Sequence, residues 1–403
     1  MKSNDVSQSR VFGAILLITG CCIGAGMLGL PPLTAAGGFK PTIILFVLSW
    51  LFMASTGLLL LEVNLWFSEE VSIVTMAGFT LGKIGKVLGW VLFAFLFYSL
   101  MVAFSAGSGQ LCADFVEETV GITIPEWVGG LVLSLLFGVF LYMGTQTVDR
   151  INRLLMVCLV GTYFALVGIG SGHVNRGFLQ HVDWGAATVA IPAMIISFGY
   201  HNLIPSLTTY LKHDVKKLRL SILVGSSIPL LIYLMWEWLM LGLIPLDGEG
   251  GLQQAVSEGT MATRLLRNAV GASWIVDLAE YFAFFAIVTT FLSVALGFVD
   301  FLADGLHVKK DGKGKVLLCT LSLAPPFLFS LIYPKIFLMA LSYAGAFGAV
   351  ILFGILPAAM VWSGRYVKQL GHKPLVPGGR LTLIVVILAS LGVVTLEIIH
   401  QFQ

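Results

Sequence analysis

Two short segments, both rich in glycine, proline and small polar residues, carry the groups that could do chemistry in this chain. The first is ITGCCIGAGMLGLPPL (18–33) and the second is ISFGYHNLIPSL (196–207). Glycine lowers helix stability, and proline removes an amide donor and clashes with the preceding turn. We therefore predict that a helix is interrupted in each segment, which leaves peptide amides and carbonyls without helical partners.

Peptide groups freed in this way could bind a zwitterion without any charged side chain. Free amides at a helix N-terminus near Ala25 and Gly26 suit a carboxylate, and carbonyls near Cys22, Ile23 and Ser197 suit an ammonium group. Aromatic residues could wall a pocket for a ring: Tyr98, Phe104, Phe198, Tyr200, Phe284 and Phe285. The predicted substrate-binding residues are Cys22, Ile23, Gly24, Ala25, Gly26, Tyr98, Ser197, Phe198, Gly199, Tyr200, His201 and Asn202. The alternative is that the glycines only allow close packing of helices, as small residues do in membranes.

Three hydroxyl side chains, Thr289, Thr290 and Ser293, fall on one face of a predicted helix. Hydroxyls beside unwound carbonyls, such as those of Gly20 and Ile23, could coordinate a small hard cation such as sodium. Threonine and serine hydroxyls also bond back to their own helix in membranes. The pattern leaves both roles open.

The elements that hold these residues must lie in a membrane. Of 403 residues, 58% are hydrophobic and only 11% are charged, whereas soluble domains carry about 25% charged residues. We predict an all-α integral membrane protein with a single transmembrane domain over 1–403, and an amphipathic external segment at 251–271. Eleven spans of about 20 apolar residues each are predicted, near 11–36, 42–66, 87–112, 125–146, 151–171, 186–211, 219–244, 274–306, 315–333, 335–363 and 381–400.

The placement of lysine and arginine predicts the orientation, because these residues are retained on the cytoplasmic side. With the N-terminus inside, 18 of the 23 fall in inner segments and only Lys40, Arg176, Arg264, Arg267 and Lys335 in outer ones. The predicted location is a bacterial inner membrane, with the N-terminus cytoplasmic and the C-terminus periplasmic. The five cysteines have no metal-ligand or disulfide spacing, no cofactor is predicted, and a net charge of +2 gives no indication of a nucleic-acid partner.

The two glycine-proline segments belong to an internal repeat. Ile23, Gly26, Leu30 and Pro32 align with identical residues 173 positions later, and Gly107 aligns with a glycine 190 positions later. The predicted repeat units of five spans, about 11–171 and 186–363, would sit inverted in the membrane, with 381–400 as an additional helix. Inverted repeats are typical of alternating-access transporters, which bind substrate near the midplane between broken helices. Neither a catalytic dyad nor a polar pore stripe is present, so an enzyme and a channel are not predicted.

Four acidic residues, Glu62, Glu237, Asp300 and Glu397, lie in or near predicted spans. Because no lysine or arginine lies deep in a predicted span, none of the four is expected to have a basic partner within the membrane. Each could bind a proton or simply be wet near a helix end. His201 lies inside the second interruption, where it could bind substrate, sense protons or brace the unwound backbone.

Several strings resemble the hydroxy/aromatic amino acid permease family of the amino acid–polyamine–organocation superfamily, and its tyrosine-specific members in particular. They include IGAGMLGLP (23–31), LLLLEV (58–63), SFGYHNLIPS (197–206), FLSVALGFVDFLAD (291–304) and LAPPFLFSLIYPKIFLMALSYAG (323–345). The resemblance covers nearly the whole chain. It implies a leucine-transporter-like 5+5 inverted repeat with broken helices 1 and 6, and import of aromatic amino acids by proton symport. It also implies a carboxylate site at Gly24, Ala25 and Gly26 and a cation position beside Thr289 and Thr290.

One residue departs from the family pattern. A lysine is expected in the fifth span, a few residues after Asn152 and Arg153, and Leu159 stands there instead. In proton-coupled relatives such a lysine can replace sodium, so its absence leaves sodium symport open. Two further alternatives remain: an uncoupled exchanger or facilitator of the same fold, and tryptophan, phenylalanine or serine as the main substrate.

Overall fold

The computed structural model describes residues 2–24, 26–248, 250–263, 265, 273–370 and 374–402. All regular structure in these residues is helical. Ten helices are long and apolar enough to cross a membrane, or eleven if the bent pair Gln8–Cys22 and Gly26–Ala35 is one span. The prediction of an all-helical membrane protein with about eleven spans is therefore confirmed.

The helices follow the predicted spans closely. The first half of the chain contains α1 (Lys2–Cys22), α2 (Gly26–Ala35), α3 (Phe39–Asn64), α4 (Ile73–Val120), α5 (Glu126–Met143) and α6 (Thr145–Gly170). Short turns of 3₁₀ helix at Ser171–His173 (η1) and Phe178–Gln180 (η2) then lead to α7 (Trp184–Ala187), η3 (Thr188–Ala190), α8 (Ile191–Ser197), η4 (His201–Leu203) and α9 (Ile204–Tyr210). The remainder contains α10 (Val215–Leu243), α11 (Leu252–Glu258), α13 (Ser273–Leu306), α14 (Gly312–Ile332), α15 (Phe337–Tyr343), η5 (Ala344–Ile355), α16 (Leu356–Trp362), η6 (Ser363–Val367) and α17 (Gly379–Gln401).

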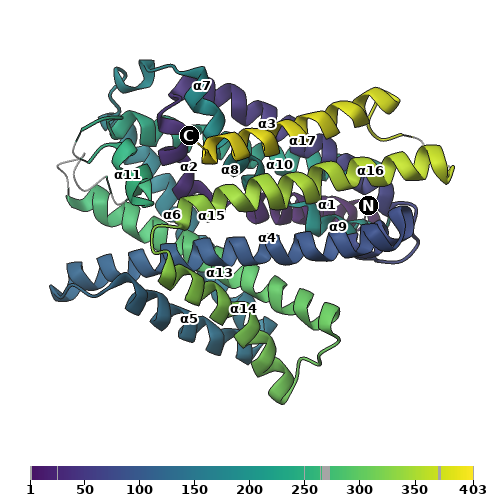
Figure 1. The fold of residues 1–403 in the computed structure, drawn as a ribbon, viewed down its shortest axis with the longest axis horizontal. Coiled ribbons are helices and arrows are strands. Elements are labelled where there is room, and N and C mark those ends of the chain that lie inside the picture. Colours follow the sequence, from purple (N-terminus) through teal and green to yellow (C-terminus); the bar gives the residue numbers. More distant parts are fainter. Residues whose placement is uncertain are drawn as a thin grey trace.

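The long helices lie side by side along one common direction (Figure 1). α1 packs against α10, α13 packs against α6 and α4, and α4 packs against α5 and α14. α5 and α14 lie together on one side of the bundle, and α17 lies on the opposite side. The first residues of α1 and the last residues of α17 point toward opposite ends of the bundle (Figure 1).

Burial separates central helices from peripheral ones. Each span contains an apolar window of 18 residues, and the buried share of that window differs between spans. It is 78% for Phe337–Val367 and 61% for Trp184–Tyr210, against 22% for Gly379–Gln401. Because every span is apolar, a low buried share marks a helix whose side chains are left for lipid. The second interrupted segment therefore lies in the middle of the bundle.

Two boundaries differ from the predicted ones. The third span was expected from residue 87, but α4 begins at Ile73 and bends at Gly82, where φ is 76° and ψ is −161°. A glycine can adopt this conformation without steric strain, so two helical pieces join there. Within the predicted external segment 251–271, the structure contains the helix α11. Gly259, with φ 66°, caps the C-terminus of this helix. Residues 264 and 266–271 of that segment lie outside the described residues.

Candidate functional site

The first glycine-proline segment contains a break between two helices. α1 ends at Cys22 and α2 begins at Gly26, and the axes of the two helices differ by 54°. The peptide N–H of Ile23 still donates to the Thr19 carbonyl at 3.1 Å, and that of Met27 donates to the Gly24 carbonyl at 3.0 Å. Ala25, a predicted substrate-binding residue, lies outside the described residues.

The second segment has a matching break. α8 ends at Ser197, residues 198–200 are not helical, and a single 3₁₀ turn leads from His201 into α9. Phe198 and Tyr200 have φ near −100° and ψ between 0 and 30°, which lies at the edge of the helical region. Proline follows at the start of α9, where a missing N–H breaks no hydrogen bond within that helix. The chain therefore leaves the helical path over about one turn.

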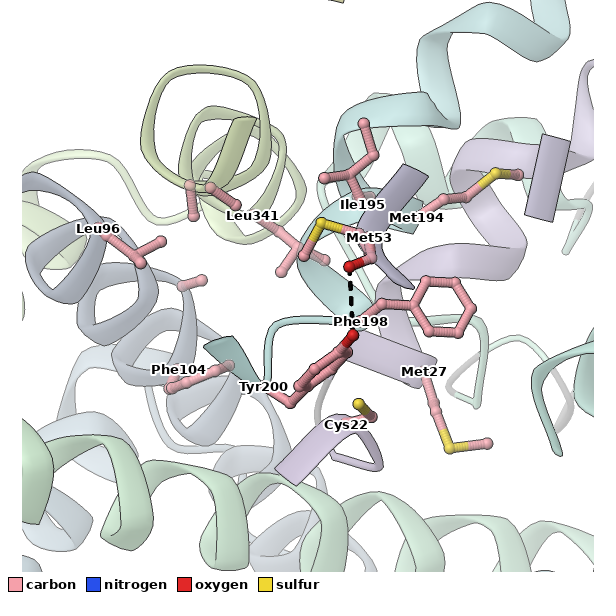
Figure 2. Close-up of a cluster of buried hydrophobic side chains, with 14 of the residues drawn as sticks. Cys22, Met27, Met53, Leu96, Phe104, Met194, Ile195, Phe198, Tyr200 and Leu341 are labelled. Atoms are coloured by element: carbon pink, nitrogen blue, oxygen red, sulfur yellow. Dashed lines mark hydrogen bonds between the residues drawn. The ribbon is translucent and has the colours of Figure 1, made fainter. Parts of the chain in front are cut away.

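A cavity of about 130 Å³ lies between these two breaks. Both breaks contribute to its wall, together with one face of α4, two residues of α13 and one residue each from α15 and η5. The lining residues are Cys21, Cys22, Gly24, Gly26, Phe93, Leu96, Phe97, Leu100, Phe104, Ile196, Ser197, Gly199, Asn202, Thr290, Val294, Leu341 and Phe353. Figure 2 shows how Leu96 and Phe104 from α4 and Leu341 from α15 stand across from the chain at Cys22 and Tyr200.

Two glycines of the first break are required by close contacts. A Cβ atom at Gly24 would lie 2.3 Å from the Thr290 hydroxyl oxygen, and one at Gly26 would lie 3.0 Å from the Ser197 hydroxyl oxygen. Any larger residue at position 24 would push α13 away from the break. The break is thus packed directly against the α13 and α8 hydroxyls.

Two of the three carbonyls that were expected to bind an ammonium group, those of Cys22 and Ser197, already have a donor. The Tyr233 hydroxyl from α10 shares its proton between the Cys22 carbonyl at 2.5 Å and the Ser197 carbonyl at 3.1 Å. Each carbonyl oxygen has two lone pairs, so each can accept a further donor. Tyr233 joins the two broken ends and was not identified from the sequence, because nothing in its own segment points to residues 36 and 211 positions away.

The α13 hydroxyls all donate to their own helix. Thr290 bonds to the Ala286 carbonyl at 2.7 Å, Thr289 bonds to the Phe285 carbonyl at 2.7 Å, and Ser293 bonds to the Thr289 carbonyl at 2.8 Å. Ser293 also accepts a hydrogen bond at 3.0 Å from the side-chain amide of Asn152 on α6. A hydroxyl that donates to a carbonyl can still accept a hydrogen bond or coordinate a cation through its oxygen.

Five predicted substrate-binding residues that the structure describes are absent from the wall of the cavity, and Ile23 is one of them. Tyr98 donates its hydroxyl to the Leu321 carbonyl on α14, and Phe198 packs edge-on against Tyr233. Tyr200 donates to the Met53 carbonyl at 3.2 Å, as the dashed line in Figure 2 shows. His201 is fully buried.

The His201 ring braces the second break from behind the cavity. Its Nε2 atom lies 2.9 Å from the Thr56 hydroxyl of α3, and its ring stacks on Phe353 with centroids 4.7 Å apart. The ring is therefore held by side chains on two neighbouring elements, which favours the bracing role among the three that the sequence left open.

An aromatic wall on α4 was missed by the sequence reading. Phe93 and Phe97 line the cavity and also line a larger vestibule of about 1050 Å³, as does Asn202. These three residues therefore stand between the cavity and the vestibule. Phe93, Phe97 and Phe104 recur along α4. Because the chain contains 28 phenylalanines, this spacing does not distinguish rings that face a cavity from rings that face lipid.

The vestibule has a more polar lining than the cavity. Its charged and titratable side chains are Glu70, Lys86, Asp300, Asp304 and His307. All five lie near span ends that the lysine and arginine distribution predicts to be cytoplasmic. Its aromatic side chains are Phe93, Phe97, Trp90 and Phe301, and the last two stack with centroids 5.5 Å apart.

The expectation that four acidic residues lack basic partners was wrong for two of them. Glu62 forms a bidentate pair with Arg365, with both N–O distances 2.6 Å, and Asp300 forms an ion pair with Lys310 at 2.6 Å. The reason is that each partner lies outside the stretch read as membrane core and reaches back to the acid with a long side chain. Glu237 and Glu397 form no ion pair within the described part of the chain.

The described residues contain no cluster of three or more histidine, cysteine or acidic residues that could hold a metal ion. The position where a lysine was expected, Leu159, is buried in the core.

Comparison with known proteins places the chain in one family. The model of the tryptophan/tyrosine permease family matches residues 7–397. The chain is 32% identical to the tyrosine-specific transport system 1 of Haemophilus influenzae, over 97% of this chain and 96% of that protein. It is 29% identical to a tryptophan-specific transport protein of Pseudomonas aeruginosa, over 89% and 87% of the two chains. It is also 26% identical to the low affinity tryptophan permease of Escherichia coli, over 98% and 96%. The chain therefore belongs to the tryptophan/tyrosine permease family.

Proposed function

We propose that this protein is a secondary active transporter that imports aromatic amino acids, with tyrosine as the main substrate, by cation symport. The observation that supports this most is a cavity lined from both helix breaks in a chain of the tryptophan/tyrosine permease family. The relatives are named as transport proteins and permeases. Their names favour tyrosine or tryptophan over other substrates.

We further propose a leucine-transporter-like 5+5 inverted repeat within a single transmembrane domain, with α17 as the additional helix. The break before α2 and the break after α8 lie 173 positions apart in the aligned segments. A five-span unit repeated in this way inverts the second copy, as alternating access requires. An odd number of spans puts the two termini on opposite sides of the membrane. The lysine and arginine distribution favours a cytoplasmic N-terminus and a periplasmic C-terminus in a bacterial inner membrane.

The cavity suggests how the amino acid would be held. Its carboxylate would face the N-terminal end of α2 at Gly26, where peptide N–H groups and the helix dipole favour an anion. Its ammonium group would face the second lone pairs of the Cys22 and Ser197 carbonyls, beside the Tyr233 hydroxyl. Its ring would extend toward Phe93 and the other apolar residues of α4, where aromatic contacts stabilise it.

The coupling cation would act at the same break. Carbonyls of Gly20 and Ile23 on the α1 side and the hydroxyls of Thr289, Thr290 and Ser293 on α13 form the proposed cation-coupling residues. Thr290 supports this assignment, because its hydroxyl oxygen packs closely against Gly24. The proposal covers both coupling ions, a proton or sodium.

Uptake of labelled tyrosine into proteoliposomes tests this proposal, with a proton gradient and a sodium gradient imposed separately. We expect accumulation above the external concentration with one of the two gradients. Exchange of tyrosine without accumulation under either gradient would refute symport and favour the uncoupled exchanger. Competition by unlabelled tryptophan, phenylalanine and serine identifies the main substrate, and inhibition by serine but not by tyrosine would overturn the substrate assignment.

A further inference from the structure

One face of α10 holds together the two sides of the first break. Tyr233 donates to the Cys22 carbonyl at the end of α1, and the Trp236 indole N–H donates to the Met27 carbonyl in the first turn of α2 at 2.7 Å. The Oε2 atom of Glu237 lies within hydrogen-bond distance, 2.6 Å, of the Thr34 hydroxyl oxygen near the end of α2. The three α10 side chains are each 0% exposed. Glu237 is thus the acidic member of a set of contacts that fixes α2 relative to α1.

The Glu237 carboxyl group has no charged partner among the described residues. Its Oε2 atom contacts the Thr34 hydroxyl, and its Oε1 atom has no hydrogen-bond partner in the described part of the chain. Taking an ionised carboxylate out of water without a partner costs several kcal/mol. Glu62, which is buried to a similar degree, is stabilised by an ion pair. Glu237 must be stabilised in another way.

The titratable groups that face this region from neighbouring elements bond elsewhere. Tyr163 on α6 donates to the Ile232 carbonyl, and Glu258 on α11 accepts from the Gln254 amide. His173 in η1 and His181 after η2 contact the carbonyls of residues 169 and 36. Lys40 at the start of α3 is exposed. Within the described residues, none of these five groups pairs with Glu237.

The positions of the oxygen atoms fit a protonated carboxyl group. The Thr34 hydroxyl oxygen lies 2.6 Å from Glu237 Oε2 and 3.2 Å from the Pro31 carbonyl oxygen, but a hydroxyl has only one proton to donate. If Glu237 carries a proton, it donates to Thr34, and Thr34 donates to Pro31. If Glu237 is ionised, Thr34 must share its one proton between Glu237 and Pro31 in a three-centre hydrogen bond.

We propose that Glu237 binds and releases the coupling proton, an inference that rests on the symport proposed above and names its ion. The proton binds at Oε2 and completes the hydrogen-bonded chain from Glu237 through Thr34 to Pro31. It leaves as a hydronium ion when a shift of α2 against α10 brings water to the carboxyl group. Because the same α10 face holds the ends of both breaks, protonation is linked to the geometry of the cavity.

Proteoliposomes that contain the wild type, Glu237→Gln or the matched control Glu258→Gln test the proposal. We expect Glu237→Gln to exchange tyrosine across the membrane but to lose proton-driven accumulation completely, because the amide mimics the protonated acid and cannot release a proton. Glu258→Gln should accumulate tyrosine as the wild type does. Proton-driven accumulation by Glu237→Gln, or accumulation by the wild type with sodium alone, would overturn the role of Glu237 and leave symport intact. Failure of the wild type to accumulate under either gradient would instead refute the proposed symport.

Infrared spectra provide a second readout that does not depend on transport. The wild type at neutral pH should show the C=O stretch of a protonated carboxyl group, and this band should be lost or weakened in Glu237→Gln. Thr34→Val keeps the acid and removes its hydrogen-bond partner, so the band should shift to higher frequency. The inference is wrong if the band is unchanged in both variants. If Glu237→Gln does not fold, the Thr34→Val spectrum is the test: a shifted band supports the inference and an unshifted band overturns it.

Discussion

The buried pair between Glu62 and Arg365 offers the sharpest test of how the structure is stabilised. The Arg365 Nε and Nη2 atoms donate to the two carboxylate oxygens at 2.6 Å, and the peptide N–H of Leu375 donates to Oε2 at 2.8 Å. The side chains are only 8% and 1% exposed. The pair connects α3 to η6, which are far apart in the sequence, so it stabilises tertiary structure rather than a single helix.

The expected magnitude follows from the burial of this pair. Arg365→Met leaves the Glu62 carboxylate buried with only the Leu375 N–H, and loss of one partner of a buried ion pair costs about 3–5 kcal/mol. The entropy of unfolding is about 2.1 cal/mol/K per residue, which over 403 residues converts this loss into a fall in Tm of about 4–6 °C.

Thermal unfolding of the purified protein in detergent measures this fall. The matched control is Arg153→Met, because Arg153 pairs with Asp149 at 2.8 Å with the two side chains 79% and 51% exposed. Exposed pairs contribute at most about 1 kcal/mol, so the control should shift Tm by about 1 °C or less. A double variant with Glu62→Gln and Arg365→Met should recover part of the loss, because no charge is left buried. Equal shifts for Arg365→Met and Arg153→Met would refute the reasoning.

Three further predictions follow from single contacts. Gly24→Ala should abolish uptake of labelled tyrosine, because its Cβ atom would lie 2.3 Å from an α13 hydroxyl, whereas Gly161→Ala on α6, with no atom within 4 Å, should leave uptake close to normal; equal uptake by the two variants would contradict this. Tyr233→Phe removes the donor shared by two buried carbonyls and should lower the free energy of unfolding by about 1–3 kcal/mol, more than Tyr98→Phe in the same thermal assay. At the N-terminus of α10, hydrogen bonds from Lys217 lower the pKa of Asp214 below its usual value. The contribution of the ionised Asp214 side chain to folding stability is therefore present above about pH 4 and is lost as the pH falls through the lowered pKa. Asp214→Ala should therefore lower Tm at neutral pH by an amount equivalent to about 1 kcal/mol and by less in acid, and a pH-independent difference would contradict the capping role.

Hydropathy, charge placement and motif strings were enough to predict the membrane class, the approximate spans and the family. These features are local, because a bilayer imposes the same length and polarity on each span separately. In each of the two glycine-proline segments regular helix is interrupted, after Cys22 and after Ser197, and both segments line one cavity. The break at Gly82 was missed because that segment is too polar to be read as part of a span.

The partners within the site could not be predicted, because each depends on how distant segments pack. Tyr233 donates to a carbonyl 211 residues away, and Arg365 reaches a carboxylate 303 residues away. Phe93 and Phe97 separate the cavity from the vestibule only because α4 faces both breaks.

The sequence by itself determined that this chain crosses a membrane many times and where its helices are weakest, since both properties depend on the residues of one segment. Only the tertiary structure decided which side chains hold the weak points together. A hydrogen bond or an ion pair requires atoms within about 3 Å of each other, and that proximity is set by the packing of the whole bundle.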